Sequence, residues 1–255
     1  MSCPHSRRSS APDLQSAVQS ALTVYVFTTG TQTPLLALLA LRRPRNLAAI
    51  ALSYAALGLV AVILSDPVVA ILALSPAPLI GSALARVVGA RAETVGALLT
   101  GTIVLSFPLL LAAIPGLGTQ VNVALFAFVI GATLAGAVPI MRDAILPIVD
   151  GARYLALAII LGAAALAALS VMDFRAVGVA ALVLVVGGVS AAFGAVVFRG
   201  DGIAAAIGAG TRDPAVAAAL AIASGLAGAG AVALAYAVLL ALSLGVAKLL
   251  VARQA

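Results

Sequence analysis

Long hydrophobic runs separated by short polar stretches fill most of this 255-residue chain. The runs Leu47–Leu64 and Val177–Phe198 are continuous, without the alternation of polar and apolar positions that a membrane β-barrel requires. A helix needs about 20 such residues, with about 17 as the lower limit, to cross a bilayer core of about 30 Å. The pattern therefore predicts an all-α polytopic membrane protein with about nine transmembrane helices. We expect these helices near 14–40, 45–65, 67–88, 92–114, 120–141, 151–171, 175–198, 202–224 and 226–251.

Composition agrees with this pattern. Hydrophobic residues make up 64% of the chain and charged residues only 9%, which excludes an ordinary soluble domain. We expect a polar N-terminal tail at 1–13 and a single transmembrane domain at 14–255 that contacts the lipid bilayer. The net charge of +6 does not indicate nucleic-acid binding, because cytoplasmic loops of membrane proteins normally carry excess Arg and Lys.

The positions of the basic residues predict an orientation. With nine crossings and the N-terminus outside, ten of the 14 basic residues fall inside, three fall outside and Arg212 falls within the membrane. This asymmetry predicts a multi-pass protein of the cell (inner) membrane with a cytoplasmic C-terminus. The inside residues are Arg42, Arg43, Arg45, Arg86, Arg91, Arg142, Arg153, Arg199, Lys248 and Arg253, and the outside residues are Arg7, Arg8 and Arg175.

Two of the expected helices contain a proline at the same point. Pro78 and Pro214 are 136 positions apart, and at the same offset Gly89 matches Gly225. The two segments are third and eighth in order, so they run in opposite directions. This predicts an inverted-topology repeat, with repeat one at about 14–114, repeat two at about 151–251 and one unpaired helix between them. The alternative is a pair of ordinary proline kinks in packed helices.

Paired interruptions near the bilayer midplane point to a transporter site. A proline removes a backbone donor and frays the turn before it, and the exposed amides and carbonyls must then face protein or a wet cavity. The half-helix after the break favours an anion and the one before it favours a cation. The candidate substrate-binding residues at the two breaks are Ser75, Pro76, Pro78, Ser82, Thr211, Arg212, Asp213 and Pro214.

Arg212 and Asp213 are the two charged residues of this set. A central Arg or Asp costs about 2.5–3.5 kcal/mol on insertion scales, and intramembrane charges are functional candidates by default. The alternative is a mutually neutralising pair that only props the break open. Thr29 and Gln32 belong to a polar cluster in the first segment and are candidates for the substrate path. The alternative for that cluster is hydrogen bonding to its own helix.

The order of several short motifs resembles the bile acid–sodium symporter family and its bacterial relatives, over about residues 20–250. The motifs are VFTTG at 26–30, LRRP at 41–44, SPAPLIGSALARVVGARAE at 75–93 and GTRDPAVAAALA at 210–221. The resemblance implies a core domain built on two crossed, broken helices, a panel domain beside it, and sodium-coupled uptake of organic anions by alternating access.

The residues that hold sodium in that family are mostly different here. The resemblance aligns the family's glutamate with Gly208, its Gln-Asn pair with Arg212-Asp213, its Ser-Asn with Gly81-Ser82 and its early glutamine with Ser53. It also places Thr100 and Thr102 near sodium-binding hydroxyls, although a Thr commonly bonds back to its own helix. The ion-binding candidates are Ser53, Ser82, Thr100, Thr102 and Asp213.

We therefore expect a secondary active transporter of a small organic anion that resembles a sodium symporter. Sodium coupling is left open, since a tethered Arg212 in place of the ion would make transport independent of sodium. The coupling ion is Na⁺ or H⁺, and we expect no cofactor, no metal and no enzymatic activity, since the only histidine is His5 in the tail and no nucleotide-binding loop occurs. One alternative is a proton or cation antiporter. The other is a membrane scaffold or receptor that does not transport.

Overall fold

The computed structural model describes residues 10–33, 41–137, 139–168 and 172–252. These residues form helices and no strand. Six of the helices are long and apolar enough to cross a membrane, which confirms the prediction of an all-α, multi-pass membrane architecture at this level. They are α3 (Pro44–Leu64), α6 (Ala92–Ala113), α7 (Gly118–Ala137), α8 (Pro139–Ala168, of which Ile145–Ala168 qualifies), α9 (Phe174–Val197) and α12 (Ala227–Ala252, of which Gly230–Leu249 qualifies).

Three further segments complete the arrangement. Helix α1 (Ser10–Gln32) has 23 residues but is too polar to count among the six. The predicted third segment consists of two short helices, α4 (Pro67–Leu74) and α5 (Gly81–Val87). The predicted eighth segment consists of α10 (Gly202–Ala205), one turn of π-helix η2 (Ala206–Gly210) and α11 (Pro214–Ala223). A short 3-10 turn, η1 (Pro115–Leu117), joins α6 to α7.

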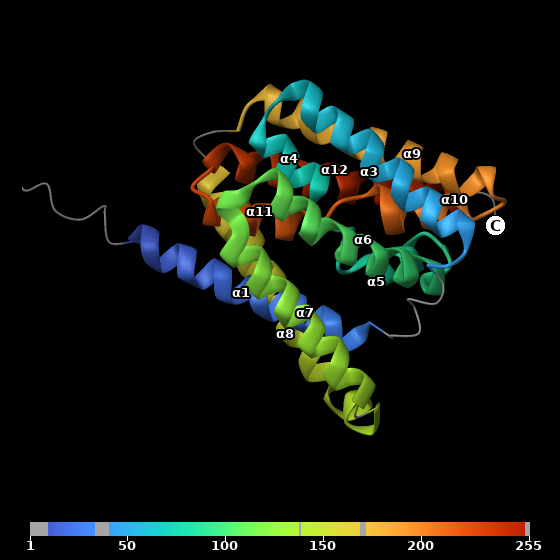
Figure 1. The fold of residues 1–255 in the computed structure, drawn as a ribbon, viewed down its shortest axis with the longest axis horizontal. Coiled ribbons are helices and arrows are strands. Elements are labelled where there is room, and N and C mark those ends of the chain that lie inside the picture. Colours follow the sequence, from blue (N-terminus) through green and yellow to red (C-terminus); the bar gives the residue numbers. More distant parts are fainter. Residues whose placement is uncertain (1–9, 34–40, 138, 169–171, 253–255) are drawn as a thin grey trace, which may run out of the picture.

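The helices form two groups (Figure 1). Helices α7 and α8 each pack along α1 to form a layer, and the remaining helices form a larger body. The layer contacts the body mainly through α11 and α12. Glycine permits the closest contact within the layer: a Cβ on Gly30 would clash with the Phe128 carbonyl of α7, and one on Gly131 would clash with the Phe27 carbonyl of α1. In lipid the hydrophobic effect does little to drive helices together, so close packing through small residues contributes much of the association.

The body is built around the antiparallel pair α3 and α9. Asp66, just after α3, forms a 2.8 Å ion pair with Arg175 in the first turn of α9, so the end of one helix lies beside the start of the other. At the opposite end, Gly200 lies against the side chain of Arg45. Gly194 brings the backbone of α9 to α3, where an added Cβ would lie 2.7 Å from the Ala48 carbonyl oxygen.

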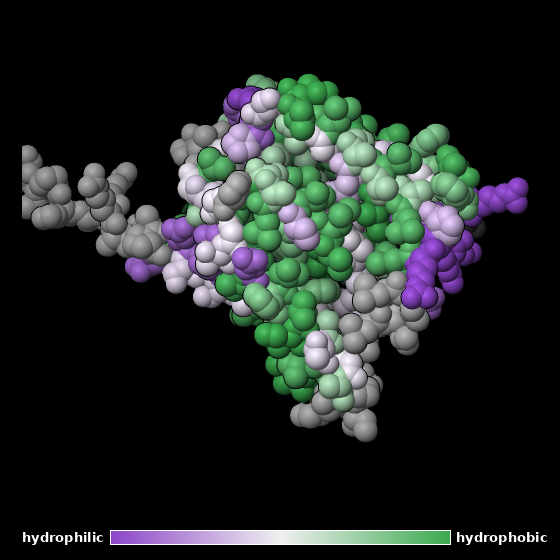
Figure 2. All heavy atoms as spheres, viewed as in Figure 1, coloured by the Kyte–Doolittle hydropathy of each residue, from purple (hydrophilic) through white to green (hydrophobic). Residues whose placement is uncertain are grey.

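The outer surface is largely hydrophobic, as expected of a protein surrounded by lipid (Figure 2). Large exposed side chains on α3 and α9 include Val62, Val185 and Val189, each at least 60% exposed. Hydrophilic residues gather toward the ends of the molecule, including the end where α3 begins.

Two predicted boundaries are wrong. Helix α1 begins at Ser10, four residues before the predicted start of the first helix at residue 14. The stretch Asp143–Asp150, between the predicted helices 120–141 and 151–171, was predicted to be a loop but lies inside α8, which runs without interruption from Pro139. Arg153, which follows this stretch and was predicted to lie on the cytoplasmic side of the membrane, is buried. Its guanidinium bonds to Asp150 in the preceding turn of α8 and to Gln32 of α1. Residues 34–40, 138 and 169–171, which belong to the predicted helices 14–40, 120–141 and 151–171, lie outside the described part of the chain.

Candidate functional site

The two helix interruptions fall where the sequence predicts them. Helix α4 ends at Leu74, and Pro76 and Pro78 lie in the link to α5. The second interruption follows η2, where Thr211 and Asp213 are extended (φ −79° and −82°) before α11 begins at Pro214. The backbone N–H of Asp213 donates a 2.8 Å hydrogen bond to the carbonyl of Pro76. We call the segments 75–80 and 211–213, which meet at this bond, the crossing.

The guanidinium of Arg212 lies at the crossing and is completely buried. Its Nε donates to the carbonyl of Ala73 at 2.8 Å, and its Nη1 donates to the carbonyls of Ala209 at 2.7 Å and Thr211 at 2.9 Å. Its Nη2 donates to the hydroxyl of Ser53 at 2.8 Å. The group also lies over the ring of Tyr54, 4.3 Å from its centroid, which adds a cation–π contact.

These acceptors are the carbonyl ends of the two interrupted helices. Ala73 is in the last turn of α4, and Ala209 is in η2, just before the second break. The partial negative charge at such ends favours a cation. Ser53 completes the cluster, because its hydroxyl donates to the same Ala209 carbonyl at 2.7 Å while accepting from Arg212. A fixed guanidinium thus occupies the cation-favouring side of the crossing.

The carboxylate of Asp213 occupies the opposite, anion-favouring side. Its Oδ1 accepts from the backbone amides of Ala215 at 2.8 Å and Val216 at 3.0 Å, which makes it the N-cap of α11. Its Oδ2 accepts from the amide of Leu79 at 2.6 Å and from the hydroxyl of Tyr25 at 3.0 Å. Leu79 belongs to the other break and Tyr25 to the layer, so one carboxylate joins three parts of the molecule.

Arg212 and Asp213 do not pair with each other. Ion pairs among the described residues include Asp150–Arg153 and Asp66–Arg175, whereas Arg212 and Asp213 bond to other groups. The adjacent charges instead point to opposite kinds of helix end, one to carbonyls and the other to amides. This arrangement does not support the alternative in which the two charges only neutralise each other.

Several other predicted residues lie at the crossing. Thr102 of α6 accepts a 3.1 Å hydrogen bond from the amide of Ala77 in the first break. The hydroxyls of Ser75 and Thr211 donate to the carbonyls of Ile71 at 2.6 Å and Ile207 at 2.5 Å, so they cap the helix ends that precede the breaks. The backbone of Ser82 lies at the start of α5, but its side chain is outside the described part of the structure.

Three predicted residues are not brought to the crossing. Thr29 donates to the carbonyl of Tyr25 and Thr100 to that of Gly96, each four positions earlier in its own helix. Gln32 donates to Asp150 of α8 at 2.7 Å and accepts from Arg153. Thr29 and Thr100 thus bond back to their own helices, which is the alternative to a substrate or ion site given above.

Two tyrosines, Tyr54 and Tyr236, are residues that the sequence prediction missed, whereas Tyr25 belongs to the polar cluster predicted in the first segment. The hydroxyl of Tyr236 in α12 accepts from the amide of Arg212 at 2.8 Å, and that of Tyr54 donates to the carbonyl of Thr102 at 3.1 Å. With Tyr25, three of the four tyrosines in the chain therefore surround the crossing. A signal was present, because a phenol hydroxyl in the middle of an apolar helix needs a buried partner.

A small cavity of about 140 Å³ lies between the layer and the body, beside Asp213. Tyr25, Leu157 and Leu161 line it from the layer, and Pro78 and Asp213 line it from the crossing. Its walls are otherwise apolar. Arg212 does not line the cavity, since its donors are used on the other side of the break.

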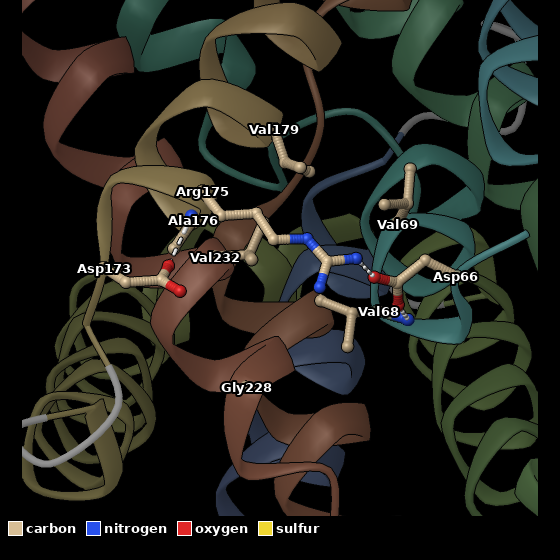
Figure 3. A pocket seen from close by; sticks show the side chains of 9 residues that line it. All are labelled: Asp66, Val68, Val69, Asp173, Arg175, Ala176, Val179, Gly228 and Val232. Carbon is tan, nitrogen blue, oxygen red and sulfur yellow. Dashed lines mark hydrogen bonds and ion pairs between the residues drawn. The ribbon is translucent and has the colours of Figure 1, made fainter. Parts of the chain in front are cut away.

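A second hollow, of about 200 Å³, lies at the ends of α3 and α9 (Figure 3). Arg175 reaches across it to Asp66, while Asp173 accepts from the amide of Ala176 at 2.8 Å. Asp66 also caps α4 by accepting from the amide of Val68. Each carboxylate is thus explained as a helix cap, and the hollow requires no ligand.

Comparison with protein-family models and with curated proteins finds no match to this chain.

Proposed function

We propose that this protein is a secondary active transporter of a small organic anion, working by alternating access without sodium. The observation that carries the proposal is the crossing, where two interrupted helices meet and hold a buried cation on their carbonyl side and a buried carboxylate on their amide side. Interrupted helices that meet within the membrane are characteristic of transporters that alternate access around a fixed site.

Backbone geometry supports nine crossings arranged as an inverted repeat. The six long helices, α1 and the two interrupted segments together make nine. Among the described residues, positive φ values occur in two matched pairs: Gly89 and Gly225, both at +71° and 136 positions apart, and Ser65 at +48° and Arg199 at +55°. Asp66 and Asp201 cap the first half-helix of each interrupted segment, accepting from the amides of Val68 and Ala204. Equivalent turns at equivalent positions are what a duplicated unit would retain.

The two groups of helices support the division implied by the resemblance to the bile acid–sodium symporter family. The α1–α7–α8 layer corresponds to a panel domain and the body to a core domain. Alternating access would then be a movement of the layer against the body, with substrate bound beside the crossing. The cavity beside Asp213 lies in this interface, and its apolar walls suit the carbon skeleton of an organic molecule.

The environment of Arg212 supports independence from sodium. Carbonyl oxygens at the C-terminal ends of half-helices hold the coupling cation in such transporters, and here the guanidinium takes these oxygens. The glutamate that the resemblance aligns with Gly208 has no room, since a Cβ at Gly208 would lie 2.9 Å from the Cβ of Leu98 and 3.0 Å from the Cα of Val95. The tethered cation would provide fixed positive charge near an anionic substrate, although its N–H groups do not face the cavity in this conformation.

Charge distribution supports the orientation, with the N-terminus outside and the C-terminus in the cytoplasm of a cell (inner) membrane. Seven described basic residues lie near one end of the helices, at the start of α3, around the α5–α6 link, after α9 and late in α12. Arg175 lies at the other end, beside Asp66 and Asp173. The seven are Arg42, Arg43, Arg45, Arg86, Arg91, Arg199 and Lys248.

The experiment has two stages. Purified protein is screened with carboxylates and sulfonates for thermal stabilisation, because a ligand that binds the folded form raises its apparent stability. A stabilising compound is then tested for uptake into proteoliposomes, with Arg212→Ala as the comparison. We expect saturable uptake that the substitution abolishes. Binding without any flux would instead indicate a scaffold or receptor.

The second candidate is a proton or cation antiporter, and the buried carboxylate of Asp213 at the crossing favours it. Such a protein would move a cation against a pH gradient when no organic anion is present. A fluorescent pH indicator inside the same proteoliposomes distinguishes the two functions, because an antiporter would dissipate an imposed pH gradient when the cation alone is added.

A further inference from the structure

We propose that Asp213 is the site of the coupled proton, so that one proton binds its carboxylate when an anionic substrate binds. This inference rests on the proposed transport function and adds the identity of the coupling ion. It is carried by the hydrogen bonds of one carboxylate, by the cavity beside it and by the charges of the crossing.

The hydrogen bonds show where a proton would go. Oδ1 accepts two amide N–H bonds from its own helix α11, and Oδ2 accepts one amide N–H from Leu79 and one hydroxyl from Tyr25. An amide N–H cannot reverse its polarity, whereas a tyrosine hydroxyl can both donate and accept. A proton on Oδ2 can therefore point toward Tyr25, whose hydroxyl turns to accept it, while the Leu79 amide keeps only the remaining acceptor capacity of Oδ2.

Protonation consequently weakens the bond to Leu79, because a neutral carboxyl oxygen accepts a hydrogen bond less strongly than a carboxylate oxygen does. Oδ1 still caps α11, so the second half-helix keeps its start. One of the bonds between the two breaks is thereby weakened, while the backbone bond from Asp213 to Pro76 remains, and the bond that ties α1 to the crossing reverses its direction. A proton on Asp213 thus loosens the contacts that a movement of the layer against the body must change.

Charge explains why the proton accompanies an anion. In the deprotonated site the positive charge of Arg212 and the negative charge of Asp213 sum to zero, and both side chains are buried. Adding an anion alone would leave a net negative charge away from water, which is costly. Adding a monovalent anion together with one proton returns the sum to zero. The proton is taken from the side to which the cavity is open and is released on the opposite side when the carboxylate re-forms its bonds.

The other titratable groups around the crossing do not offer the same site. Tyr25, Tyr54 and Tyr236 face it from α1, α3 and α12, and their phenols are ordinarily neutral near pH 7. On α8, Arg153 and Asp150 are bonded to each other and to Gln32. Helices α4 and α7, which also contact α11, carry no titratable residue.

The test requires no substrate. Spin labels are placed at Leu155→Cys on α8 and Val185→Cys on α9, both exposed positions, in a Cys3→Ser background of the full chain in liposomes. Distances between the labels are measured at about pH 5 and about pH 8, a range in which a histidine also titrates. We expect the mean distance between layer and body to change by more than about 2 Å between the two values, the scale of a domain rearrangement.

Two variants make the test specific. Asp213→Asn and Asp213→Ser retain a side chain that caps a helix but cannot titrate, and we expect their label distances to be the same at both pH values. The controls Asp150→Asn and His5→Gln should keep the pH response of the parent. Two substitutions at position 213 separate loss of the proton site from a folding defect, which thermal unfolding would reveal.

The inference is overturned if the parent distances do not change with pH, or if the change persists in Asp213→Asn. These outcomes are independent of the proposed function. A chain without any flux can still show a pH response that depends on Asp213, and a chain that transports an anion can lack that response.

Discussion

The backbone amide of Asp213 and the carbonyl of Pro76 lie 2.8 Å apart in a hydrogen bond that joins the two interrupted helices. The residue before Asp213 directs its guanidinium to the carbonyl of Ala73, one turn before the first break. The dipeptide Arg212-Asp213 therefore bonds to both ends of the first interruption, to Ala73 before it and to Leu79 after it. The charges of this dipeptide are complementary to the helix ends that they meet, which explains how two charged side chains are accommodated in the interior of the protein.

Replacement of Arg212 by Gln should destabilise the protein by about 2–5 kcal/mol. The carbonyls of Ala73 and Ala209 would lose their donors in a buried site, and each unsatisfied group costs about 1–3 kcal/mol. Arg212→Lys should recover only part of the loss, because an ammonium lacks the planar arrangement of donors. Thermal unfolding in detergent measures the effect.

The matched control for this prediction is Arg175→Gln. Arg175 forms an ion pair with Asp66 at 2.8 Å, but its side chain is 73% exposed. Exposed pairs are worth about 1 kcal/mol or less. Equal losses for the two substitutions would contradict the role assigned to the buried guanidinium.

Gly208→Ala should impair folding although it adds only one methyl group. The new Cβ would meet the backbone of α6 at Val95 and the side chain of Leu98 at about 3 Å. Overpacking of this kind costs about 1–3 kcal/mol. Gly58→Ala in α3 is the control, since no atom lies within 4 Å of its added Cβ. The yield of monodisperse protein and its unfolding temperature should fall for Gly208→Ala alone.

Cysteine labelling tests the orientation. In a Cys3→Ser background, a cysteine at Arg43 should be protected from a membrane-impermeant thiol reagent in intact cells, and a cysteine at Arg175 should react. Both side chains are exposed at opposite ends of the helices. Permeabilised cells provide the control for reactivity at Arg43. The reverse pattern would place the basic end outside and contradict the predicted topology.

The interruptions were predictable from sequence because they depend on local chemistry. A proline disfavours the helical turn before it, and the equal spacing of Pro78 to Gly89 and of Pro214 to Gly225 indicated a repeated unit. The structure agrees closely, with α4 ending at Leu74 and α11 beginning at Pro214. The length and apolar character of the six long helices were equally evident from the hydrophobic runs.

What was missed depends on contacts between distant segments. The stretch Asp143–Asp150 resembled a loop because it carries two carboxylates and Pro147, and nothing in the local sequence shows that Gln32 of α1 lies beside Arg153. Tyr54 and Tyr236 are isolated polar groups in apolar helices, and only the fold brings them to Arg212. The direction of the guanidinium was equally hidden: we expected it to bind substrate directly, whereas it donates to the protein's own carbonyls.

The central claim is that Arg212 takes the place of a coupling sodium ion at the carbonyl side of the crossing. The most direct measurement is uptake of the identified anion into proteoliposomes when all external sodium is replaced by choline. Our account predicts the same initial rate in sodium and in choline for the parent protein, and loss of uptake in both for Arg212→Gln. Uptake that collapses in choline would contradict it and would show that sodium is bound by other ligands.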